Sequence, residues 1–426
     1  MLLIYRTITN VLYPILIIIV YLRKIIGKED ATRFKEKIFT SYFDVRKNEK
    51  RELIWLHVAS IGELLSVINL IKELERSEKN FEFLITTVTL SSGRIAEKVF
   101  KGKKNITHRY FPLDCNHLIN NFLDRWKPML VLFVDSEIWP NFLFAIKKRG
   151  IKLGLINARI TEKTFYKWNF FKKTSKKVFS NFDFSFSGNR ESEKYLKLLG
   201  VKKIKYFGNL KLASTLSPVE ISEQNKIILN NYKVWCAAST HPGEEEFCFQ
   251  AHIKIKKKHS NIVTIIIPRH IDRISEIFKL SKKYDLKTQI IDNSKDMIKK
   301  DIEIVLINSF GITDMFFNYC KFVFIGKSLI KKLKKVGGQN PIEAAKLGCK
   351  IFHGPYVYNF DEIYELLKIR KFSQLINTED ELSTQLIDNF NNSYEKVEKE
   401  KIKELDLFGK KILEETKTEL TKFINI

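Results

Sequence analysis

The sequence predicts an α/β protein with two doubly wound domains, each built on a parallel sheet, and three observations support this prediction. Short apolar runs alternate with helix-length amphipathic segments along most of the 426 residues. Apolar strands that alternate with helices indicate a parallel sheet covered on both faces. The polar stretch LASTLSPVEISEQN at residues 212–225 interrupts the alternation, which then starts again. The chain is long enough for each half to bury a core of its own.

The apolar runs predicted as strands fall into two groups. In the first half they are LIWLHVA (53–59), FEFLITTV (81–88), RYF (109–111), MLVLFVD (129–135), KLGLIN (152–157), FDFSF (182–186) and KYFG (205–208). In the second half they are KVWCAAS (233–239), NIVTIIIP (261–268), IEIVLIN (302–308), KFVFIG (321–326) and CKIFHG (349–354). Amphipathic segments predict helices between the first strands, over 64–75, 116–126, 139–149 and 170–179.

These patterns also give the expected domain boundaries. We expect an N-terminal membrane anchor over residues 1–28, a first α/β domain over 29–214, a linker over 215–225, a second α/β domain over 226–405 and a C-terminal helix over 406–426. A cleft is expected between the two domains. In such sheets ligands bind outside the carboxyl ends of the strands, so the residues just after each strand are the candidates for function.

The N-terminus is the most apolar part of the chain. Val11–Leu22 is an unbroken apolar run, preceded by a segment that carries Arg6 and Asn10. Residues 2–22 together reach about 30 Å if they are helical, which is the thickness of a bilayer core. Arg23, Lys24 and Lys28 follow directly, which favours a cytoplasmic location for the remainder. We predict an uncleaved anchor; the alternative is a buried helix docked on the first domain.

The charge balance favours an anionic partner. There are 74 Lys and Arg against 49 Asp and Glu, a formal net charge of +25. Such an excess suits nucleic acid, an acidic membrane leaflet or a phosphorylated substrate, although lysines on solvated faces explain it equally well. The five cysteines are far apart in sequence and form no metal-binding pair. We predict that they are buried free thiols in a reducing compartment.

Glu63 is the first candidate functional residue, because it follows the strand at 53–59 and stands three residues after Ser60. Free backbone N–H groups and the helix dipole stabilise a carboxylate in a first helical turn, which predicts that it stays ionised, as a general base must. The alternative is a capping box in which Ser60 caps the helix and Glu63 closes the box. The spacing alone favours capping.

Polar residues also follow other strands of the first half. Asp135 and Glu137 follow the strand at 129–135, and Trp139-Pro140 then begins a helix. No His or further carboxylate lies nearby in sequence, so we favour an electrostatic role over a metal site. Asn157-Ala158-Arg159 follows the strand at 152–157. Lys211 follows a Gly-Asn turn and can reach into a cleft, although a lysine in a turn is usually solvated.

In the second half the strand ends carry groups suited to a phosphate. Pro268-Arg269-His270 places a permanent cation and an imidazole after one strand. Ser309-Phe310-Gly311 follows the next strand, and His241-Pro242-Gly243 precedes an acidic helix start at Glu244–Glu246.

A helix N-terminus is expected within VGGQNPIEAAKLG. Asn340 fits the N-cap, Pro341 the first helical position, Glu343 the third, and Gly348 the stop. We expect Gly337 and Gly338 to let backbone amides approach a phosphate there. Glu343 is also suited to accept hydrogen bonds from ribose hydroxyls, as acidic residues do in dinucleotide-binding folds.

Several common sites are absent from the sequence. No GxGxxG or GxxxxGK[ST] motif lies between a strand and a helix, so neither an ordinary NAD domain nor an NTPase is supported. There is no GxSxG elbow and no zinc-ligand cluster.

Taken together, the segments at the strand ends resemble one family, the 3-deoxy-D-manno-octulosonic acid (Kdo) transferases of lipopolysaccharide synthesis. The resemblance extends from the N-terminal apolar segment to about residue 370. It rests on HVASIGE, TTVTLSSG, DSEIWPN, INARITE, GNLK, AASTHPGEEE, IPRH and GGQNPIEAAKLG followed by GPYVYNF, in that order. Each motif is weak alone, but the ordered set is specific, and it overturns the preference for a purely capping Glu63.

The resemblance implies a GT-B glycosyltransferase fold, with two Rossmann-like domains, and no cofactor. It implies metal-independent transfer of Kdo from CMP-Kdo to the lipid A precursor, a tetraacyl disaccharide bisphosphate, with inversion at the anomeric carbon. It places the chain at the inner (cytoplasmic) membrane by a single N-terminal anchor, with the catalytic domains on the cytoplasmic side and no nucleic acid as partner. The alternatives are another GT-B transferase with a different nucleotide sugar, and a non-catalytic basic protein that binds nucleic acid.

The resemblance also implies roles for residues. Glu63 is the expected catalytic base, and Glu137 and Lys211 are expected to stabilise the transition state. The residues expected to hold CMP are Pro268, Arg269, Ser309, Phe310, Gly311, Asn340, Pro341, Ile342 and Glu343. The sequence departs from the family at three positions and in the loop between Ser328 and Gly337, which is longer and unusually basic here. The family usually has glycine where Lys327 stands, histidine where Gln339 stands, and more often glutamate where Asp135 stands.

Overall fold

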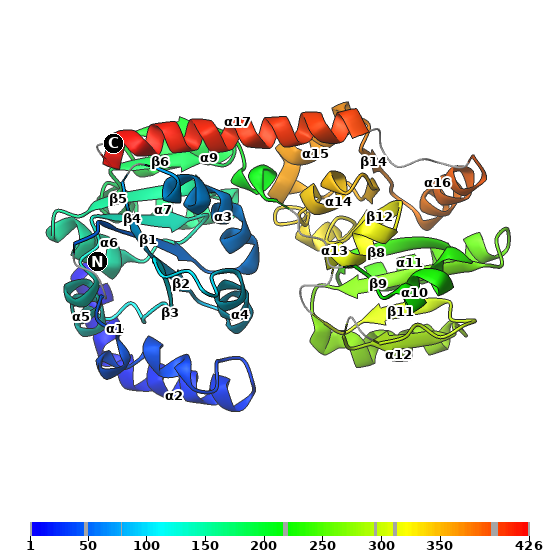
Figure 1. Ribbon diagram of the computed structural model, residues 1–426, viewed down its shortest axis with the longest axis horizontal. Coiled ribbons are helices and arrows are strands. Elements are labelled where there is room, and N and C mark those ends of the chain that lie inside the picture. Colours follow the sequence, from blue (N-terminus) through cyan, green and yellow to red (C-terminus); the bar gives the residue numbers. More distant parts are fainter. Residues whose placement is uncertain are drawn as a thin grey trace. The chain divides into compact units, whose positions relative to one another are not determined.

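The computed structural model describes residues 2–46, 50–77, 79–215, 220–293, 296–309, 313–392 and 399–424. The chain divides into two compact units, one of Met1–Ser214 with Phe408–Ile426 and one of Thr215–Leu407. Each unit contains one seven-stranded sheet with helices on both faces, and all strand pairs are parallel (Figure 1). The prediction of two doubly wound α/β sheets is therefore confirmed. Part of the expected linker, residues 216–219, lies outside the described residues.

The sheet of the first unit has the strand order β3-β2-β1-β4-β5-β6-β7. Its strands are β1 (Leu53–Val58), β2 (Glu82–Thr87), β3 (Ile106–Tyr110), β4 (Leu130–Val134), β5 (Lys152–Ala158), β6 (Phe184–Ser187) and β7 (Ile204–Tyr206). The central strand β1 is buried along its whole length. Because side chains alternate across a strand, Trp55 packs into the core on one face while Ile54 and Leu56 pack into the core on the other. This two-sided burial explains the continuous apolar runs of the sequence.

Helices cover both faces of this sheet. They are α3 (Ile61–Glu75), α4 (Leu90–Val99), α5 (Asn116–Trp126), α6 (Pro140–Lys148), α7 (Glu162–Phe170), α8 (Lys172–Phe179) and α9 (Arg190–Leu199), with 3-10 turns η1 (Arg33–Lys37), η2 (Thr40–Tyr42) and η3 (Leu210–Ala213). One core lies between the sheet and α5, α6 and α8, and the other lies between the sheet and α3 and α4. The helix expected over 170–179 is interrupted at Phe171, which separates α7 from α8.

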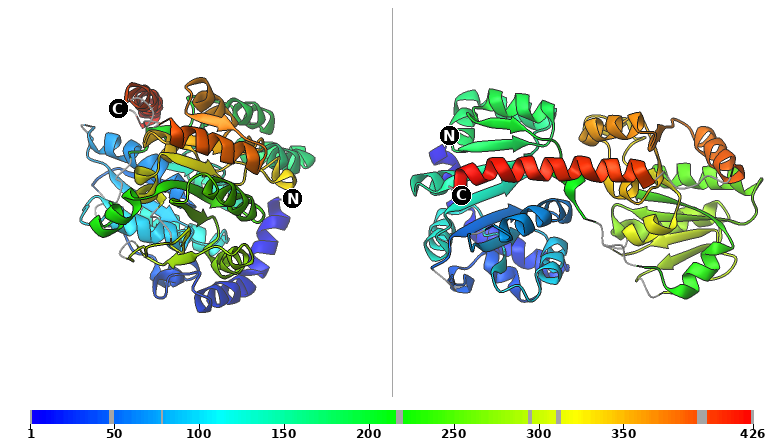
Figure 2. Two further views of the ribbon diagram at one scale, coloured as in Figure 1. Left: turned by 90° about the vertical axis from the view of Figure 1, so that its right-hand side faces the viewer. Right: turned by 45° about the horizontal axis from the view of Figure 1, so that its top comes forward.

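The C-terminal helix completes the first unit. Helix α17 (Lys399–Ile424), red in Figures 1 and 2, carries Leu420 and Ile424, which are buried in the core beneath α3 and α4. Phe423 stacks on Phe184 of β6 with ring centroids 4.0 Å apart. The last residues of the chain therefore belong to the core of the unit that begins it.

The N-terminal apolar segment forms two helices instead of the single helix that we expected. The chain bends by 54° between helices α1 (Leu2–Val11) and α2 (Tyr13–Ile25). Among the described residues no single helix is both long and apolar enough to cross a bilayer. One side of the pair docks on the first unit, because the hydroxyl of Tyr5 donates to Asp114 and the ring of Tyr13 contacts that of His117. The other side exposes apolar residues, namely Leu3, Ile4, Ile8, Val11, Leu12, Ile15, Ile18, Ile19, Leu22 and Ile25.

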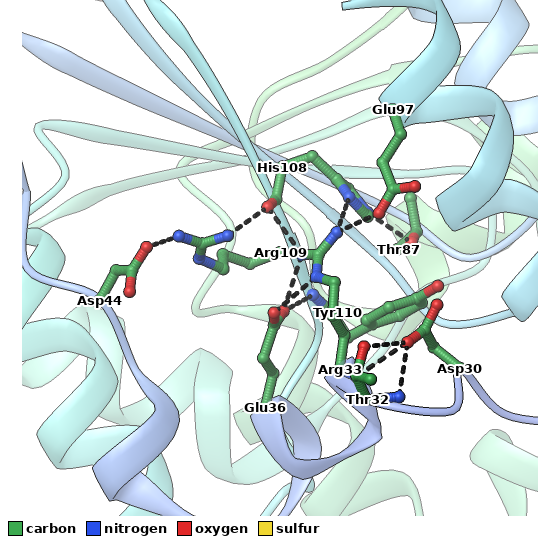
Figure 3. Close-up of polar contacts among 10 residues, drawn as sticks. All are labelled: Asp30, Thr32, Arg33, Glu36, Asp44, Thr87, Glu97, His108, Arg109 and Tyr110. Atoms are coloured by element: carbon green, nitrogen blue, oxygen red, sulfur yellow. Dashed lines mark hydrogen bonds and ion pairs between the residues drawn. The ribbon is translucent and has the colours of Figure 1, made fainter. Parts of the chain in front are cut away.

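A polar cluster fixes the segment after α2 to the edge strand β3 (Figure 3). The guanidinium of Arg33 donates to both carboxylate oxygens of Glu36 at 2.7 and 2.9 Å and to the backbone oxygen of His108 at 3.0 Å. Glu36 in turn accepts from the backbone N–H of Tyr110 at 2.9 Å. Burial, followed by the charge of Arg33, lowers the pKa of His108 to about 3. This imidazole is therefore neutral at physiological pH, and its role is structural.

The second unit repeats the architecture with the strand order β10-β11-β9-β8-β12-β13-β14. Its strands are β8 (Lys233–Thr240), β9 (Ile262–Pro268), β10 (Thr288–Ile291), β11 (Ile304–Ile307), β12 (Phe322–Ile325), β13 (Lys350–His353) and β14 (Ser373–Leu375). Its helices and turns are α10 (Glu223–Asn230), α11 (Glu244–Lys256), η4 (Ile271–Arg273), α12 (Ile274–Lys283), α13 (Thr313–Tyr319), η5 (Lys331–Leu333), α14 (Ile342–Lys346), η6 (Tyr358–Phe360), α15 (Asp361–Ile369) and α16 (Glu379–Asn391). The short edge strands β10 and β14 were not predicted. The prediction of buried free thiols is confirmed for all five cysteines.

Candidate functional site

Glu63 lies in the first turn of α3, directly after β1. Ser60 is the N-cap, and its hydroxyl oxygen accepts from the backbone N–H of Glu63 at 3.4 Å. The Glu63 carboxylate accepts from the hydroxyl of Ser60 at 2.8 Å and from the backbone N–H of Ala59 at 2.7 Å. In a capping box the carboxylate accepts instead from the N-cap's own N–H. The cap is therefore present and Glu63 stands at the position the box requires, but its carboxylate accepts from the backbone N–H one residue before the N-cap.

Two further carboxylates follow the neighbouring strand β4. Asp135 is buried and adopts a left-handed backbone conformation with φ of 62°, which is unusual for a residue other than glycine. Glu137 is half-buried, and one of its oxygens accepts from the indole N–H of Trp139 at 2.8 Å. Since β1 and β4 are adjacent parallel strands, Glu63, Asp135 and Glu137 gather at one edge of the sheet.

A buried histidine supports Glu137. His57 on β1 is fully buried and stacks on Phe111 with ring centroids 3.7 Å apart. Its Nε2 atom lies 3.3 Å from Oε2 of Glu137, and its Nδ1 atom lies 2.9 Å from the hydroxyl oxygen of Thr86. Burial lowers the pKa of His57, so the imidazole is neutral. The carboxylate can only accept, so a neutral His57 meets it with Nε2–H as the donor.

The hydroxyl of Thr86 completes this chain of hydrogen bonds. The indole N–H of Trp55 donates to its oxygen at 2.8 Å, which leaves the Thr86 proton to be donated to Nδ1 of His57. Each polar atom in this series of hydrogen bonds thus has a partner. The carboxylate of Glu137 accepts hydrogen bonds from the N–H groups of both His57 and Trp139.

The surroundings push the pKa values of the two glutamates apart. Burial raises the pKa of Glu63 to about 7, and the charges of Asp135 and Glu137 add to this, while the donors at Ala59 and Ser60 oppose it. Burial also acts on Glu137, but the hydrogen bonds from His57 and Trp139 outweigh it and lower the pKa of that carboxyl. The expectation of a fully ionised Glu63 is therefore wrong in degree, because neither its burial nor the carboxylates after β4 were visible in its local sequence. Oppositely shifted carboxyls are typical of an acid–base site.

Lys211 joins this group from the loop after β7. Its ammonium nitrogen lies 3.4 Å from Oδ2 of Asp135. A side-chain carbon placed on Gly62 would lie 3.8 Å from Cε of Lys211, so the lysine passes close to the start of α3. The expected Glu63, Glu137 and Lys211 thus lie in one cluster together with Asp135.

Buried polar and backbone contacts hold the loop that carries Lys211. The amide oxygen of Asn157, at the end of β5, accepts from the backbone N–H of Leu210 at 2.9 Å. On the other side α17 presses against the loop, since a side-chain carbon on Gly409 would lie only 2.1 Å from the backbone oxygen of Leu212. Only glycine fits there, so Asn157 and Gly409 together fix the position of η3.

In the second unit Pro268 ends β9 and is buried, and Arg269 follows with an exposed side chain. The backbone N–H of Arg269 donates to the carbonyl of Thr240 at 3.1 Å, which joins the ends of β8 and β9. Ser309 follows β11 and is half-buried. Phe310 and Gly311 lie outside the described residues.

The expected helix start at Asn340 is one residue further along. Helix α14 begins at Ile342, Pro341 occupies the cap position, and the amide oxygen of Asn340 accepts from the backbone N–H of Ile342 at 3.1 Å. Glu343 lies in the first turn of this helix.

The two glycines before α14 have a packing role that we did not expect. A side-chain carbon on Gly337 would lie 2.3 Å from the backbone oxygen of Tyr356, and one on Gly338 would lie 2.9 Å from Val357. The N–H of Gly338 already donates to the carbonyl of Lys327 at 2.7 Å. That amide is therefore occupied within the protein, which corrects the expectation that it approaches a phosphate.

An internal carboxylate fills the turn after β12. Glu244, at the start of α11, accepts backbone N–H groups from four residues, His241, Lys327, Ser328 and Leu329, at 2.7 to 3.1 Å. Lys327 has φ of 58° in this turn, a conformation that glycine adopts without strain. The departure from glycine noted in the sequence thus falls at a position where the backbone favours glycine.

Sequence reasoning did not consider His57 or Gly409, and it noted Trp139 and Asn157 without assigning them a role. In the sequence His57 is only a polar residue inside an apolar strand, and neither Asn157 nor Gly409 stands near Lys211. Within the part of the chain that the structure describes, no group of three or more His, Cys, Asp or Glu side chains is arranged to hold a metal ion.

Comparisons with known proteins bear on the family of the chain. A family model described as 3-deoxy-D-manno-octulosonic-acid transferase (kdotransferase) matches residues 32–214. The chain is 33% identical to the 3-deoxy-D-manno-octulosonic acid transferase of Rickettsia bellii over 355 residues, covering 82% of each protein. It is 30% identical to the enzyme of the same name from Rickettsia felis, with 100% of each chain covered.

Solved structures support the fold. The chain is similar to a UDP-N-acetylglucosamine 2-epimerase of Listeria monocytogenes, described as putative, with a TM-score of 0.58, 15% identity, and 87% of this chain and 97% of that one covered. It is also similar to the apo structure of OtsA, with a TM-score of 0.53, 12% identity, and 88% and 99% covered. These likenesses bear on architecture alone.

Proposed function

The chain belongs to the 3-deoxy-D-manno-octulosonic acid (Kdo) transferase family, and from this premise we propose that it moves Kdo from CMP-Kdo to the lipid A precursor, a tetraacyl disaccharide bisphosphate. The chain is thus a glycosyltransferase with the GT-B fold. The transfer inverts the anomeric carbon and requires no metal. The observation that carries the proposal is the pair of glutamates at the ends of β1 and β4, whose pKa values are shifted in opposite directions.

The proposed step begins at Glu63. Its carboxylate removes the proton from a hydroxyl of the acceptor as that oxygen attacks the anomeric carbon of Kdo. The bond from this carbon to the phosphate oxygen of CMP breaks, and the electron pair leaves with CMP. A pKa of about 7, raised by burial, suits a base that accepts a proton near neutral pH.

Glu137 and Lys211 act on the charges that this step creates. Positive charge develops at the anomeric carbon as CMP departs, and the negative charge of the ionised Glu137 stabilises it. His57 and Trp139 hold that carboxylate in place. Lys211 balances the negative charge of the donor, and Asp135 orients the ammonium group.

The second unit holds the donor in this proposal. The cation of Arg269 and the backbone around Pro268 and Ser309 bind the phosphate and cytidine, together with Phe310 and Gly311. Asn340, Pro341, Ile342 and Glu343 complete the nucleotide site at the start of α14. The exposed guanidinium of Arg269 supports this assignment, since phosphate binding requires an accessible cation.

The location follows from the acceptor, which is a membrane lipid. We assign α1 and α2 as the single anchor in the inner membrane, with the two units on the cytoplasmic side. The exposed apolar side of the helix pair supports this assignment.

Purified protein incubated with CMP-Kdo and the lipid A precursor tests the proposal by mass spectrometry. We expect a product heavier by one or more Kdo residues. A metal chelator should not change the turnover, and NMR should show that the anomeric configuration of Kdo is inverted in the product. Glu63→Gln is expected to abolish transfer without unfolding the protein, and CMP but not UDP is expected to inhibit. Full activity of Glu63→Gln, or inhibition by UDP instead of CMP, would contradict the proposal.

A further inference from the structure

The segment from α7 through α8 has an unusual composition. Between Glu162 and Asp183 the chain carries six lysines and no Asp or Glu. Among the residues that the structure describes, none of these six lysine ammonium groups is paired with a carboxylate. The segment is therefore a concentrated, uncompensated positive surface on the first unit.

Large aromatic side chains are exposed among these lysines. Phe170 is 81% exposed, Tyr166 61% and Phe171 50%, whereas Phe165 is buried and stacks on Tyr195. The helical spacing puts Lys163, Tyr166, Lys167 and Phe170 together on the outer face of α7. Exposed aromatic rings that alternate with lysines are typical of helices that lie in a membrane interface, and soluble surfaces rarely gather such rings in one place.

The lysines of α8 also surround a hollow of about 530 Å³ between α8 and the end of α9. Its lining residues are Lys172, Lys176, Lys177, Ser180, Lys197, Leu198 and Gly200. Gly200 has φ of 112°, and a side-chain carbon there would lie 3.2 Å from Cα of Lys176. This close approach of the two helix ends gathers four ammonium groups around one opening, where anionic headgroups are attracted.

The same side of the first unit carries the N-terminal helices. Tyr13 of α2 packs against the same core as Val178 and Phe179 of α8, so both helices cover one face of the sheet. Helix α6 lies between α1 and α8, with Arg6 of α1 placed 5.9 Å from the ring centroid of Phe144. Both views in Figure 2 show the N-terminus beside the helices of this region. The α7–α8 segment and the N-terminal helices thus cover the same face of the sheet.

We propose that the α7–α8 segment is a second membrane-contact surface, which binds anionic phospholipid headgroups through its lysines and inserts Tyr166, Phe170 and Phe171 between them. The proposal extends the proposed function, which places the acceptor in a membrane, but it is tested without any transfer reaction. Lysines near an anionic leaflet are attracted by its surface potential, and aromatic rings favour the headgroup level. The two contacts would hold the first unit in a fixed orientation, which a single anchor does not.

A fluorescent label at position 170 gives the most direct test. All five native cysteines are buried, so Phe170→Cys in the full chain is labelled selectively with an environment-sensitive dye. On vesicles that contain phosphatidylglycerol we expect a blue-shifted emission that brominated lipid quenches. The control is Ile369→Cys in the second unit, where the native side chain is 75% exposed, and we expect no shift there. A label at 170 that stays in water while the chain sediments with the vesicles would overturn the proposal.

Charge variants test the lysines. We expect Lys172→Ala, Lys173→Ala, Lys176→Ala and Lys177→Ala together to weaken partitioning onto phosphatidylglycerol vesicles by at least about tenfold. The matched control combines Lys257→Ala, Lys258→Ala, Lys282→Ala and Lys283→Ala, all exposed in the second unit, and should stay within about twofold. Equal loss in the two sets would show a nonspecific charge effect and would overturn the assignment.

Competing ligands separate this surface from other anion sites. Displacement by inorganic phosphate, or a response of the label to duplex DNA but not to vesicles, would each overturn the proposal in favour of a soluble anion or a nucleic acid. We expect the α8 variants to keep full transfer activity on detergent-solubilised acceptor. Loss of vesicle binding with intact transfer would support this inference, whereas absence of transfer in the native chain would contradict only the proposed function.

Discussion

The Nε2 atom of His57 lies 3.3 Å from Oε2 of Glu137, so a fully buried imidazole supports the half-buried carboxylate of the proposed catalytic site. His57→Phe keeps a ring against Phe111 but removes the donor, whereas His57→Gln retains an N–H group at nearly the same position. We expect kcat to fall about 10- to 100-fold in the Phe variant and only a few-fold in the Gln variant. Steady-state kinetics on folded protein checks this, and equal activity of the two variants would show that the hydrogen bond has no role.

The raised pKa of Glu63 predicts a pH dependence of transfer. Burial and the charge of Asp135 raise the pKa to about 7, so the base form, and with it kcat/KM, should rise up to pH 7 and level off above it. Asp135→Asn removes one raising charge and should move the midpoint to lower pH. Ser60→Ala removes a donor to the carboxylate and should move the midpoint to higher pH. Shifts of the same sign in both variants would contradict the assignment of the midpoint to Glu63.

The same carboxyl should destabilise the folded protein at high pH. A group whose pKa is raised on folding binds its proton more tightly in the native state, so stability falls as pH rises from about 4.5 to about 7. The full effect is about 3 kcal/mol, reached above pH 7. Glu63→Gln lacks this titration and should gain stability over the native protein across that range. Denaturant unfolding at pH 5 and pH 8 measures the difference, which should be larger at pH 8.

Asn157 should act on catalysis through the loop of Lys211. Asn157→Gly removes the oxygen that accepts from Leu210 N–H but suits the backbone, since φ at this position is 48°. Asn157→Ala removes the same oxygen and adds backbone strain. We expect both variants to lose about tenfold in kcat and the Ala variant to lose about 1 kcal/mol more in stability. If kcat fell much further in the Ala variant than in the Gly variant, in step with stability, the result would argue against a positioning role for the Asn157 oxygen.

Gly409 offers a second route to the same loop. In Gly409→Ala the new carbon would meet the backbone oxygen of Leu212 at 2.1 Å, so α17 or η3 must shift. We expect a loss of about 1–3 kcal/mol in stability and reduced transfer, because Lys211 moves with η3. A matched substitution, Leu407→Ala, lies on the same helix with its side chain 62% exposed and should change neither. Kinetics and thermal unfolding of both variants check this prediction.

The sequence predicted the architecture better than the site. Apolar runs located the buried strands β1 and β4 because both faces of each are covered, which leaves a continuous signal. The edge strands β10 and β14 are short and partly exposed, so they carry no such signal. The break at Phe171 was missed because apolar and basic residues continue across it. The ordered motifs indicated the family. The hydrophobic periodicity alone did not.

The properties of Glu63 show why the rest was out of reach. Its position at a helix start was visible in the sequence, but its raised pKa comes first from burial and then from the charges of Asp135 and Glu137, which lie nearby because β1 pairs with β4. Likewise, the close approach of Gly337 to the backbone of Tyr356 is a packing constraint from a distant segment, which its local sequence did not show. Electrostatics and close packing both depend on neighbours that local sequence does not identify.

Helix α17 has a consequence for biosynthesis. Leu420 and Ile424 fill the core beneath α3, and Phe423 stacks on β6, so the first unit lacks part of its interior until residues 420–424 are translated. Domains generally fold in the order in which they are made. Here the second unit, residues 215–407, is fully synthesised before the first has all its core side chains. The first unit is thus the last to reach its native state, and a nonsense mutation just before codon 408 would remove core side chains from a unit whose sheet is encoded by residues 53–206.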